Sequence, residues 1–129
     1  MQQAPTIAIV DDDGSVRLAL ENLVRSLGYN ARTFASAEET LQSPDLDEAA
    51  CLIADVQMPG MSGVDLQDVL RKQGHHIPMV FITAFPEDRI RDRVLKAGAV
   101  CFLIKPFDSG KLIDCLHMAL QKRTDAAQQ

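Results

Sequence analysis

Residues 52–63 read Leu52-Ile53-Ala54-Asp55-Val56-Gln57-Met58-Pro59-Gly60-Met61-Ser62-Gly63, and this stretch decides the fold. Its apolar opening predicts a strand that is buried on both faces, as in a parallel sheet covered by helices. The Pro and Gly residues that follow end the strand. Asp55 therefore stands at the carboxyl end of a strand, which is where open α/β sheets bind ligands. From this stretch alone, the carboxylate can be a helix cap, a metal ligand or a nucleophile.

Apolar runs and amphipathic segments alternate along the rest of the chain. Short apolar or β-branched runs predict strands at residues 6–10, 29–34, 51–54, 79–83 and 100–104. Apolar residues at helical spacing predict helices that open near residues 14, 36, 63, 86 and 108, the first of them capped by Asp13. Strand and helix alternate five times, which implies an α/β fold in which a parallel five-stranded sheet carries helices on both faces.

The length and charge of the chain bound its class. We expect a single domain over residues 1–129, with its core at about 6–122, a frayed tail at 124–129 and no output domain. The net charge of -5 argues against a nucleic-acid surface, which needs clustered Lys and Arg. No apolar stretch is long enough to span a membrane, and the start lacks the pattern of a signal peptide. We therefore expect a cytoplasmic domain without nucleic-acid or membrane contact.

The cysteines show neither CxxC nor zinc-site spacing. They are Cys51, Cys101 and Cys115, and all three lie in apolar surroundings. We expect them to be reduced packing residues.

Polar side chains stand at the carboxyl ends of four predicted strands: Asp11 and Asp12, Asp55, Thr83 and Lys105. All carboxyl ends of a parallel sheet lie at one edge, so we expect these side chains to share a rim although they are distant in sequence. Crowded carboxylates repel one another. A divalent cation relieves this repulsion, and oxygen ligands without His or Cys favour Mg²⁺.

The same rim suits a phosphoryl group. Lys105 supplies a positive charge and Thr83 a hydroxyl donor for phosphoryl oxygens. Phosphoryl transfer needs mostly positioning and charge neutralisation, so an acceptor carboxylate, a metal, a lysine and a hydroxyl are sufficient. Asp11 and Asp12 are adjacent and fit metal binding, whereas Asp55 is alone on its strand and fits the nucleophile.

In this order and spacing, four motifs resemble a response-regulator receiver domain of two-component signalling. They are Val10-Asp11-Asp12, residues 55–63, Ile82-Thr83-Ala84 and Lys105-Pro106-Phe107. The resemblance covers roughly residues 6–122 and is greatest to the FixJ-type transcriptional regulators. It implies a doubly wound, flavodoxin-like (βα)5 fold with strand order 2-1-3-4-5.

The resemblance also implies roles for the rim residues. Asp55 would accept a phosphoryl group from the phosphohistidine of a sensor histidine kinase. Mg²⁺ (or Mn²⁺) would be held by Asp12, Asp55 and the backbone carbonyl of Gln57, with Asp11 acting through water. The phosphoryl oxygens would be bound by Thr83, Lys105 and the backbone of Ala84. The domain would catalyse only its own phosphorylation and dephosphorylation, so it is expected to be a signalling protein rather than an enzyme.

The output is expected to pass through one face of the domain. Phe102 matches the aromatic switch of the family, which turns inward when Thr83 moves toward the phosphate. The fourth helix, fifth strand and fifth helix would change with it, which is expected to control transcription. By the same likeness, this face forms a homodimer on phosphorylation.

One departure from the family pattern is Phe85-Pro86 after Ala84, where small or polar residues are common. A bulky ring beside the phosphoryl site is expected to obstruct hydrolytic water and to prolong the phosphorylated state.

Two alternative functions remain. Residues 9–15 resemble the DxDG opening of a small haloacid-dehalogenase-type aspartyl phosphatase, in which Asp11 would be the nucleophile and Asp13 the acid/base. Against it, no later strand ends in an acidic pair, and Asp55 is left unexplained. A flavodoxin-like binding module without chemistry is the other alternative, and it predicts no Mg²⁺ affinity and no labelling by acetyl phosphate.

Overall fold

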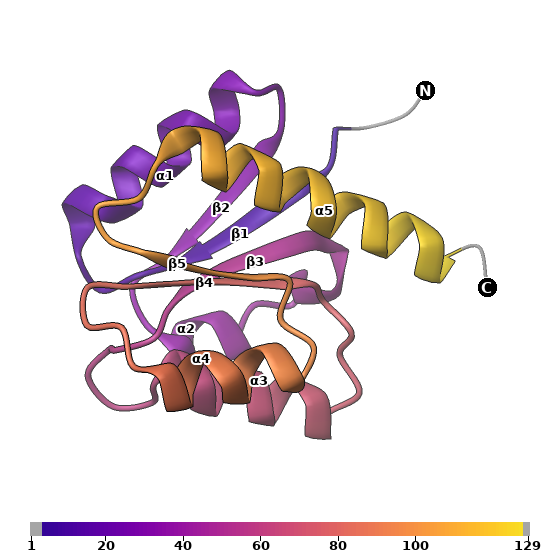
Figure 1. Ribbon diagram of the computed structural model, residues 1–129. Coiled ribbons are helices and arrows are strands. Elements are labelled where there is room, and N and C mark those ends of the chain that lie inside the picture. The colour runs from indigo at the N-terminus through magenta and orange to yellow at the C-terminus, as the bar shows by residue number, and fades with distance from the viewer. Residues whose placement is uncertain (1–3, 128–129) are drawn as a thin grey trace.

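The computed structural model describes residues 4–127 of the chain, with side chains described for residues 4–122. Its centre is one parallel sheet with strand order β2-β1-β3-β4-β5 (Figure 1). The strands are β1 (Thr6–Val10), β2 (Asn30–Phe34), β3 (Ala49–Asp55), β4 (Met79–Thr83) and β5 (Cys101–Ile104). The predicted α/β class, parallel sheet and strand order are confirmed.

The helices form two layers. They are α1 (Gly14–Ser26), α2 (Ala37–Leu41), α3 (Gly63–Lys72), α4 (Asp88–Lys96) and α5 (Ser109–Ala127), with a 3-10 turn η1 (Leu46–Glu48) before β3. In Figure 1, α1 and α5 cover one face of the sheet, and α2, α3 and α4 cover the other. None of the described helices is long and apolar enough to cross a membrane.

The core has one apolar cluster on each face of the sheet. Alternate residues of β1 divide between the faces: Ile7 and Ile9 pack with α1 and α5, and Ala8 and Val10 pack with α2, α3 and α4. β3 lies at the centre, and all seven of its residues are buried. This burial on both faces explains why its sequence is a continuous apolar run rather than an alternating one.

Local capping residues fix where two helices begin. The Asp13 side chain caps α1, because its Oδ1 accepts hydrogen bonds from the backbone N–H groups of Ser15 (2.9 Å) and Val16 (3.3 Å). This is the predicted role of Asp13. Ser62 and Asp65 form a reciprocal capping box at the start of α3, directly after the loop that follows Asp55. Both caps lie beside the carboxyl edge of the sheet and hold the loops of the site.

Two predicted boundaries are wrong. Residues 124–127 are helical and belong to α5, where a frayed tail was predicted. This segment contains no Gly or Pro, and its two alanines are strong helix formers that let α5 continue from the preceding turn. Residues 128–129 of the predicted tail lie outside the described part of the chain. β3 also begins at Ala49, two residues before the predicted start.

The expectation of three reduced cysteines is also wrong. Cys101 and Cys115 form a disulfide, with their Cα atoms 6.0 Å apart. The bond joins β5 to α5, and sequence spacing could not reveal it because the pairing depends on how the helix packs against the strand. Cys51 is the free cysteine of the described residues. Its burial raises the pKa of the thiol to about 12, so Cys51 is an inert packing residue as predicted.

Candidate functional site

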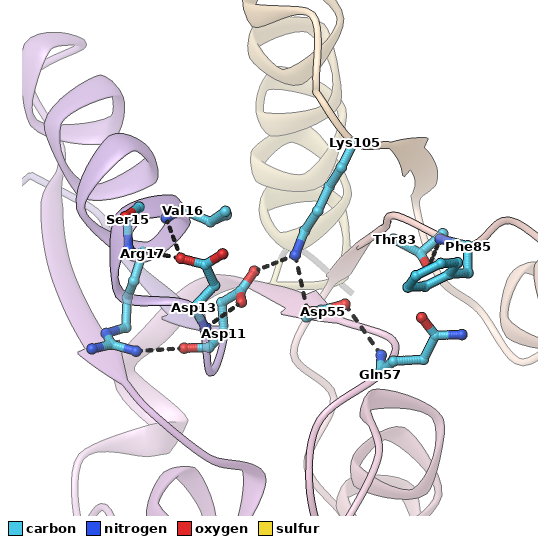
Figure 2. A network of polar contacts seen from close by, with 10 residues as sticks. All are labelled: Asp11, Asp13, Ser15, Val16, Arg17, Asp55, Gln57, Thr83, Phe85 and Lys105. Carbon is cyan, nitrogen blue, oxygen red and sulfur yellow. Dashed lines mark hydrogen bonds and ion pairs between the residues drawn. The ribbon is translucent and has the colours of Figure 1, made fainter.

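The site lies at the carboxyl edge of the sheet, where four strands end (Figure 2). Asp11 and Asp12 follow β1, Asp55 is the last residue of β3, Thr83 is the last residue of β4, and Lys105 follows β5. Asp11, Asp12 and Asp55 each offer a carboxylate oxygen, and these oxygens lie within 4.8 Å of one another. The sheet therefore brings together acids that are more than forty residues apart in sequence.

Lys105 bridges two of these acids. Its Nζ donates a hydrogen bond to Asp55 Oδ2 (2.9 Å) and lies 2.9 Å from Asp11 Oδ2. The Lys105 side chain is 16% exposed, whereas the Asp11 side chain is fully buried and that of Asp55 nearly so. One ammonium thus serves two buried carboxylates, and Asp12 adds a third acid at the exposed side of the group. Negative charge remains in excess, which is the condition that a bound cation would relieve.

The loops orient both buried carboxylates. The backbone N–H of Gln57 donates to Asp55 Oδ1 (3.1 Å), and that of Asp13 donates to Asp11 Oδ1 (2.9 Å). Each acid therefore uses one oxygen in its own turn, as Asp commonly does, and directs the other toward Lys105. The buried Oδ2 of Asp11 accepts no hydrogen bond from the described residues besides its ion pair. An all-oxygen group with this under-satisfied atom fits a hard divalent cation.

Charge coupling alters the titration of the pair. Burial raises the pKa of Asp55; the hydrogen bond from Lys105 lowers it, and the negative charge of Asp11 raises it again, so that the net shift is upward. Burial alone would lower the pKa of Lys105, but its close contacts with the Asp11 and Asp55 carboxylates more than offset this. Lys105 therefore stays protonated and charged, whereas the folded site disfavours the ionised form of Asp55.

Thr83 lies beside the acidic cluster without bonding to it. Its hydroxyl oxygen accepts a hydrogen bond from the backbone N–H of Phe85 (3.0 Å), and no hydrogen bond links it to the carboxylates among the described residues. Figure 2 shows Thr83 and Phe85 on the side of Asp55 away from Asp11. Thr83 is buried, whereas Phe85 is 68% exposed. The backbone of Lys105 is tied to the same strand end, because its N–H donates to the Thr83 carbonyl (2.8 Å).

The remaining predicted residues lie around this centre. Gln57 lies in the β3–α3 loop, two residues after Asp55, with its side chain exposed, and Ala84 follows Thr83 directly. Phe102 is half-buried on β5 and packs against the core cluster on the α2, α3 and α4 side. Phe102 directly follows Cys101, which forms the disulfide, and precedes Lys105 by three residues.

Two residues that sequence reasoning missed also contact the site. Arg17 on α1 donates from Nη1 to the backbone carbonyl of Asp11 (2.7 Å). Glu38 on α2 accepts from the backbone N–H of Met61 (3.4 Å), and a Cβ on Gly60 would stand 2.6 Å from its Oε2. Gly60 has φ +77°, a backbone conformation that favours glycine there. The glycine in the loop was a visible signal, but nothing in the sequence paired it with Glu38.

Comparisons with known proteins agree with this geometry. The family model described as "Response regulator receiver domain" matches residues 7–117. Nodulation protein W of Bradyrhizobium diazoefficiens is 42% identical over 116 residues, which cover 90% of this chain and 51% of that protein. Response regulator protein TodT of Pseudomonas putida is 40% identical over 128 residues, which cover 96% of this chain and 56% of that protein. The chain thus spans about half the length of these curated relatives.

Solved structures give the same result. The response regulator StyR superposes with a TM-score of 0.87 at 41% identity, covering 97% of this chain and 63% of that one. FixJ-N superposes with a TM-score of 0.82 at 33% identity, covering 93% of this chain and 96% of that one. An acidic triad at the carboxyl edge, a lysine after the last strand and a match over almost the whole chain lead to one conclusion. The chain belongs to the family of response regulator receiver domains.

Proposed function

We propose that Asp55 is the phosphoacceptor of this receiver domain and takes its phosphoryl group from the phosphohistidine of a sensor histidine kinase in the cytoplasm. The observation that carries the proposal is the position of Asp55. Its carboxylate ends the central strand, is nearly buried, and shares the Lys105 ammonium with Asp11. The family match and this position leave no support for the phosphatase alternative, in which Asp11 would be the nucleophile.

The transfer follows from the groups at the site. An oxygen of the Asp55 carboxylate attacks phosphorus, an O–P bond forms, and the P–N bond to the kinase imidazole breaks, leaving that histidine neutral after it takes up a proton. The Lys105 ammonium is already within hydrogen-bond distance of Asp55. In the proposed reaction it forms an ion pair with a phosphoryl oxygen. Thr83 and the backbone of Ala84 bind the other oxygens in this proposal. The Thr83 hydroxyl would donate its proton to a phosphoryl oxygen, a role that its present hydrogen bond, accepted from the Phe85 N–H, does not use.

Trapping the acyl phosphate tests the proposal directly. The domain is treated with acetyl phosphate and Mg²⁺, reduced with borohydride and digested, and the modified aspartate is located by mass spectrometry. Modification of Asp55 is the expected result. Modification of Asp11 would revive the phosphatase mechanism, and a chain without any modified aspartate would indicate a binding module without chemistry.

Asp12, Asp55 and the Gln57 carbonyl are proposed to hold Mg²⁺ (or Mn²⁺), with Asp11 acting through water. The ion would neutralise charge on the carboxylates and on the transferred phosphoryl group. Support comes from the all-oxygen donor set, its excess negative charge and the under-satisfied Asp11 Oδ2.

Replacing Asp12 with asparagine is expected to weaken Mg²⁺ binding by about tenfold or more, because a charged ligand is lost at an exposed position where the fold tolerates the change. Titration calorimetry measures the affinity, and the rise of the melting temperature with Mg²⁺ gives an independent reading. Asp114→Asn removes the same charge from the exposed side of α5 and serves as the control. Equal affinities of the two variants would exclude Asp12 as a ligand.

Phosphorylation is proposed to shift a pre-existing equilibrium of the α4–β5–α5 face through Thr83 and Phe102. Each element of this face carries a large apolar side chain that is exposed: Leu95 on α4, Ile104 on β5 and Met118 on α5. A second copy of the domain would cover these side chains, which supports a phosphorylation-dependent homodimer. Control of transcription is the proposed output of the whole protein.

Phe85→Ala is expected to shorten the lifetime of the phosphorylated domain several-fold. The Phe85 ring is exposed beside Thr83, so removing it would open a path for the water that hydrolyses the acyl phosphate. Loss of label after removal of the phosphodonor measures the rate. Leu18→Ala, at another exposed apolar residue, controls for general effects on the surface. Equal lifetimes for Phe85→Ala and the native domain would refute the role of the ring.

A further inference from the structure

The Cys101–Cys115 disulfide is a feature that the phosphoacceptor function does not use. Cys101 is the first residue of β5, the edge strand of the sheet, which pairs with β4 alone. Cys115 lies on the side of α5 that packs on the sheet, together with Leu112, Leu116 and Ala119. The disulfide therefore ties the edge strand covalently to the helix that covers it.

The bond is next to the residue assigned to the switch. Successive residues of a strand point to opposite faces, so Cys101 points toward α5 while Phe102 packs with the cluster on the opposite side. A change in Phe102 that shifts β5 also moves Cys101, which is bonded to α5 through Cys115. With the disulfide closed, strand and helix can move only together.

The three cysteines differ in their exposure to solvent. Cys101 is half-buried, whereas Cys115 and Cys51 are buried. Burial raises the pKa of the Cys51 thiol to about 12, so its thiolate is scarce. Exchange chemistry is therefore directed to the pair on β5 and α5, with Cys101 as the sulfur that a small thiol reaches first. In a reducing compartment, disulfides in ordinary proteins are usually transient or redox-sensing rather than structural.

We propose that Cys101 and Cys115 form a reversible thiol–disulfide modification site that restrains the α4–β5–α5 face. Opening and closing occur by exchange with a small thiol and its disulfide, of the glutathione class. In closing, the two protein thiols become one disulfide and one molecule of oxidised glutathione becomes two thiols, through a mixed disulfide. In opening, the same bonds exchange in reverse. The restraint on switching rests on the proposed phosphoacceptor function, whereas the modification itself does not.

The first experiment tests the modification site alone. The full chain is incubated with reduced or with oxidised glutathione, quenched with acid, unfolded and alkylated with a maleimide. After the oxidised treatment, we expect alkylation at Cys51 only, and after the treatment with reduced glutathione we expect alkylation of Cys101 and Cys115 as well. Cys101→Ser should leave Cys115 unable to form the intramolecular bond. Full alkylation of all three cysteines after the oxidised treatment would overturn the proposal.

The second experiment measures the restraint. Reduced and oxidised domains are treated with acetyl phosphate and Mg²⁺, and hydrogen exchange of the β5 and α5 amides is compared with that of untreated samples. We expect the change caused by phosphorylation to be about fivefold smaller in the oxidised domain, a typical size for coupling between two sites. Cys101→Ser should respond like the reduced domain under both treatments, and Cys51→Ala should behave like the native chain.

The two proposals fail in different ways. Equal responses of the oxidised and reduced domains, both labelled at Asp55, would overturn the restraint. Absence of label at Asp55 in both forms would refute the phosphoacceptor function, and the modification site would then stand or fall on the alkylation pattern.

Discussion

Replacing Asp55 with asparagine is expected to reduce labelling by acetyl phosphate to background. The amide has nearly the shape of the carboxylate, and its oxygen can still accept the hydrogen bond that Gln57 now donates to Asp55 Oδ1 (3.1 Å). It is, however, not a nucleophile, and losing an attacking group of this kind typically costs more than about a thousandfold in rate. Phosphorylation is measured by radiolabel transfer or by the mass of the intact chain.

The control for this loss is Asp114→Asn, which removes an exposed carboxylate on α5 and should be labelled like the native domain. Asp11→Asn distinguishes the two acids that share Lys105. It is expected to be labelled slowly but still on Asp55. Stoichiometric labelling of Asp55→Asn would show that another residue is the acceptor.

The same substitution is expected to make the domain more stable at neutral pH. Burial, together with the negative charge of Asp11, raises the pKa of Asp55 above its ordinary value of 3.8 in the folded state. The folded state therefore binds the Asp55 proton more tightly than the unfolded state does. This contribution is fully present below pH 3.8 and is lost as the pH rises through the raised pKa. Because asparagine does not ionise, the free energy of unfolding of Asp55→Asn does not fall for this reason.

Denaturant unfolding followed by circular dichroism tests the pH dependence, since the chain contains no Trp for fluorescence. Between about pH 4 and about pH 7, the free energy of unfolding of the native domain without Mg²⁺ should fall relative to that of Asp55→Asn. A constant difference between the two proteins over this range would contradict the upward shift of the Asp55 pKa.

Lys105→Met is expected to lower the free energy of unfolding by about 3 kcal/mol near neutral pH in the absence of Mg²⁺, because it leaves two buried carboxylates without their counter-ion. Nζ of Lys105 lies 2.9 Å from both Asp11 Oδ2 and Asp55 Oδ2, and methionine fills most of the same volume without a charge. The measurement is denaturant unfolding of native and variant domains with and without Mg²⁺.

Mg²⁺ should restore more stability to Lys105→Met than it adds to the native domain, because a cation then replaces the missing ammonium. Lys111→Met changes an exposed lysine at the start of α5 and should shift the free energy of unfolding by less than about 0.5 kcal/mol. If Lys105→Met were as stable as Lys111→Met, the contacts of Lys105 with the two acids would contribute nothing to the free energy of unfolding.

Several features of the fold could be predicted because they are written in short stretches of sequence. A continuous apolar run such as residues 52–54 is typical of a strand buried on both faces, and all of β3 is buried. Asp13 caps α1 through bonds to residues two and three positions ahead, and Gly28 follows the last turn of α1 with φ +91°. Such signals act over a few residues, so no knowledge of the packing is needed to read them.

The gathering of the acids could also be foreseen, since it follows from topology. Parallel strands end at one edge, so Asp11, Asp55 and Lys105 had to lie along that edge once the strands were recognised. The sequence could not show that the Lys105 ammonium contacts both carboxylates, those of Asp11 and Asp55. The bridging position of Lys105 depends on the register of β1, β3 and β5 and on the low exposure of the acids, which are properties of the whole sheet.

The sequence by itself determined the sheet, its helices and the set of charged groups at one edge, because hydrophobic period, caps and turn residues are local. Only the tertiary structure decided that Lys105 bridges Asp11 and Asp55, that Glu38 packs against Gly60, and that Cys101 meets Cys115. Each of these contacts joins side chains to groups whose distance depends on packing or on a loop conformation. Their physical origin is the close fit of separate elements, which no spacing along the chain encodes.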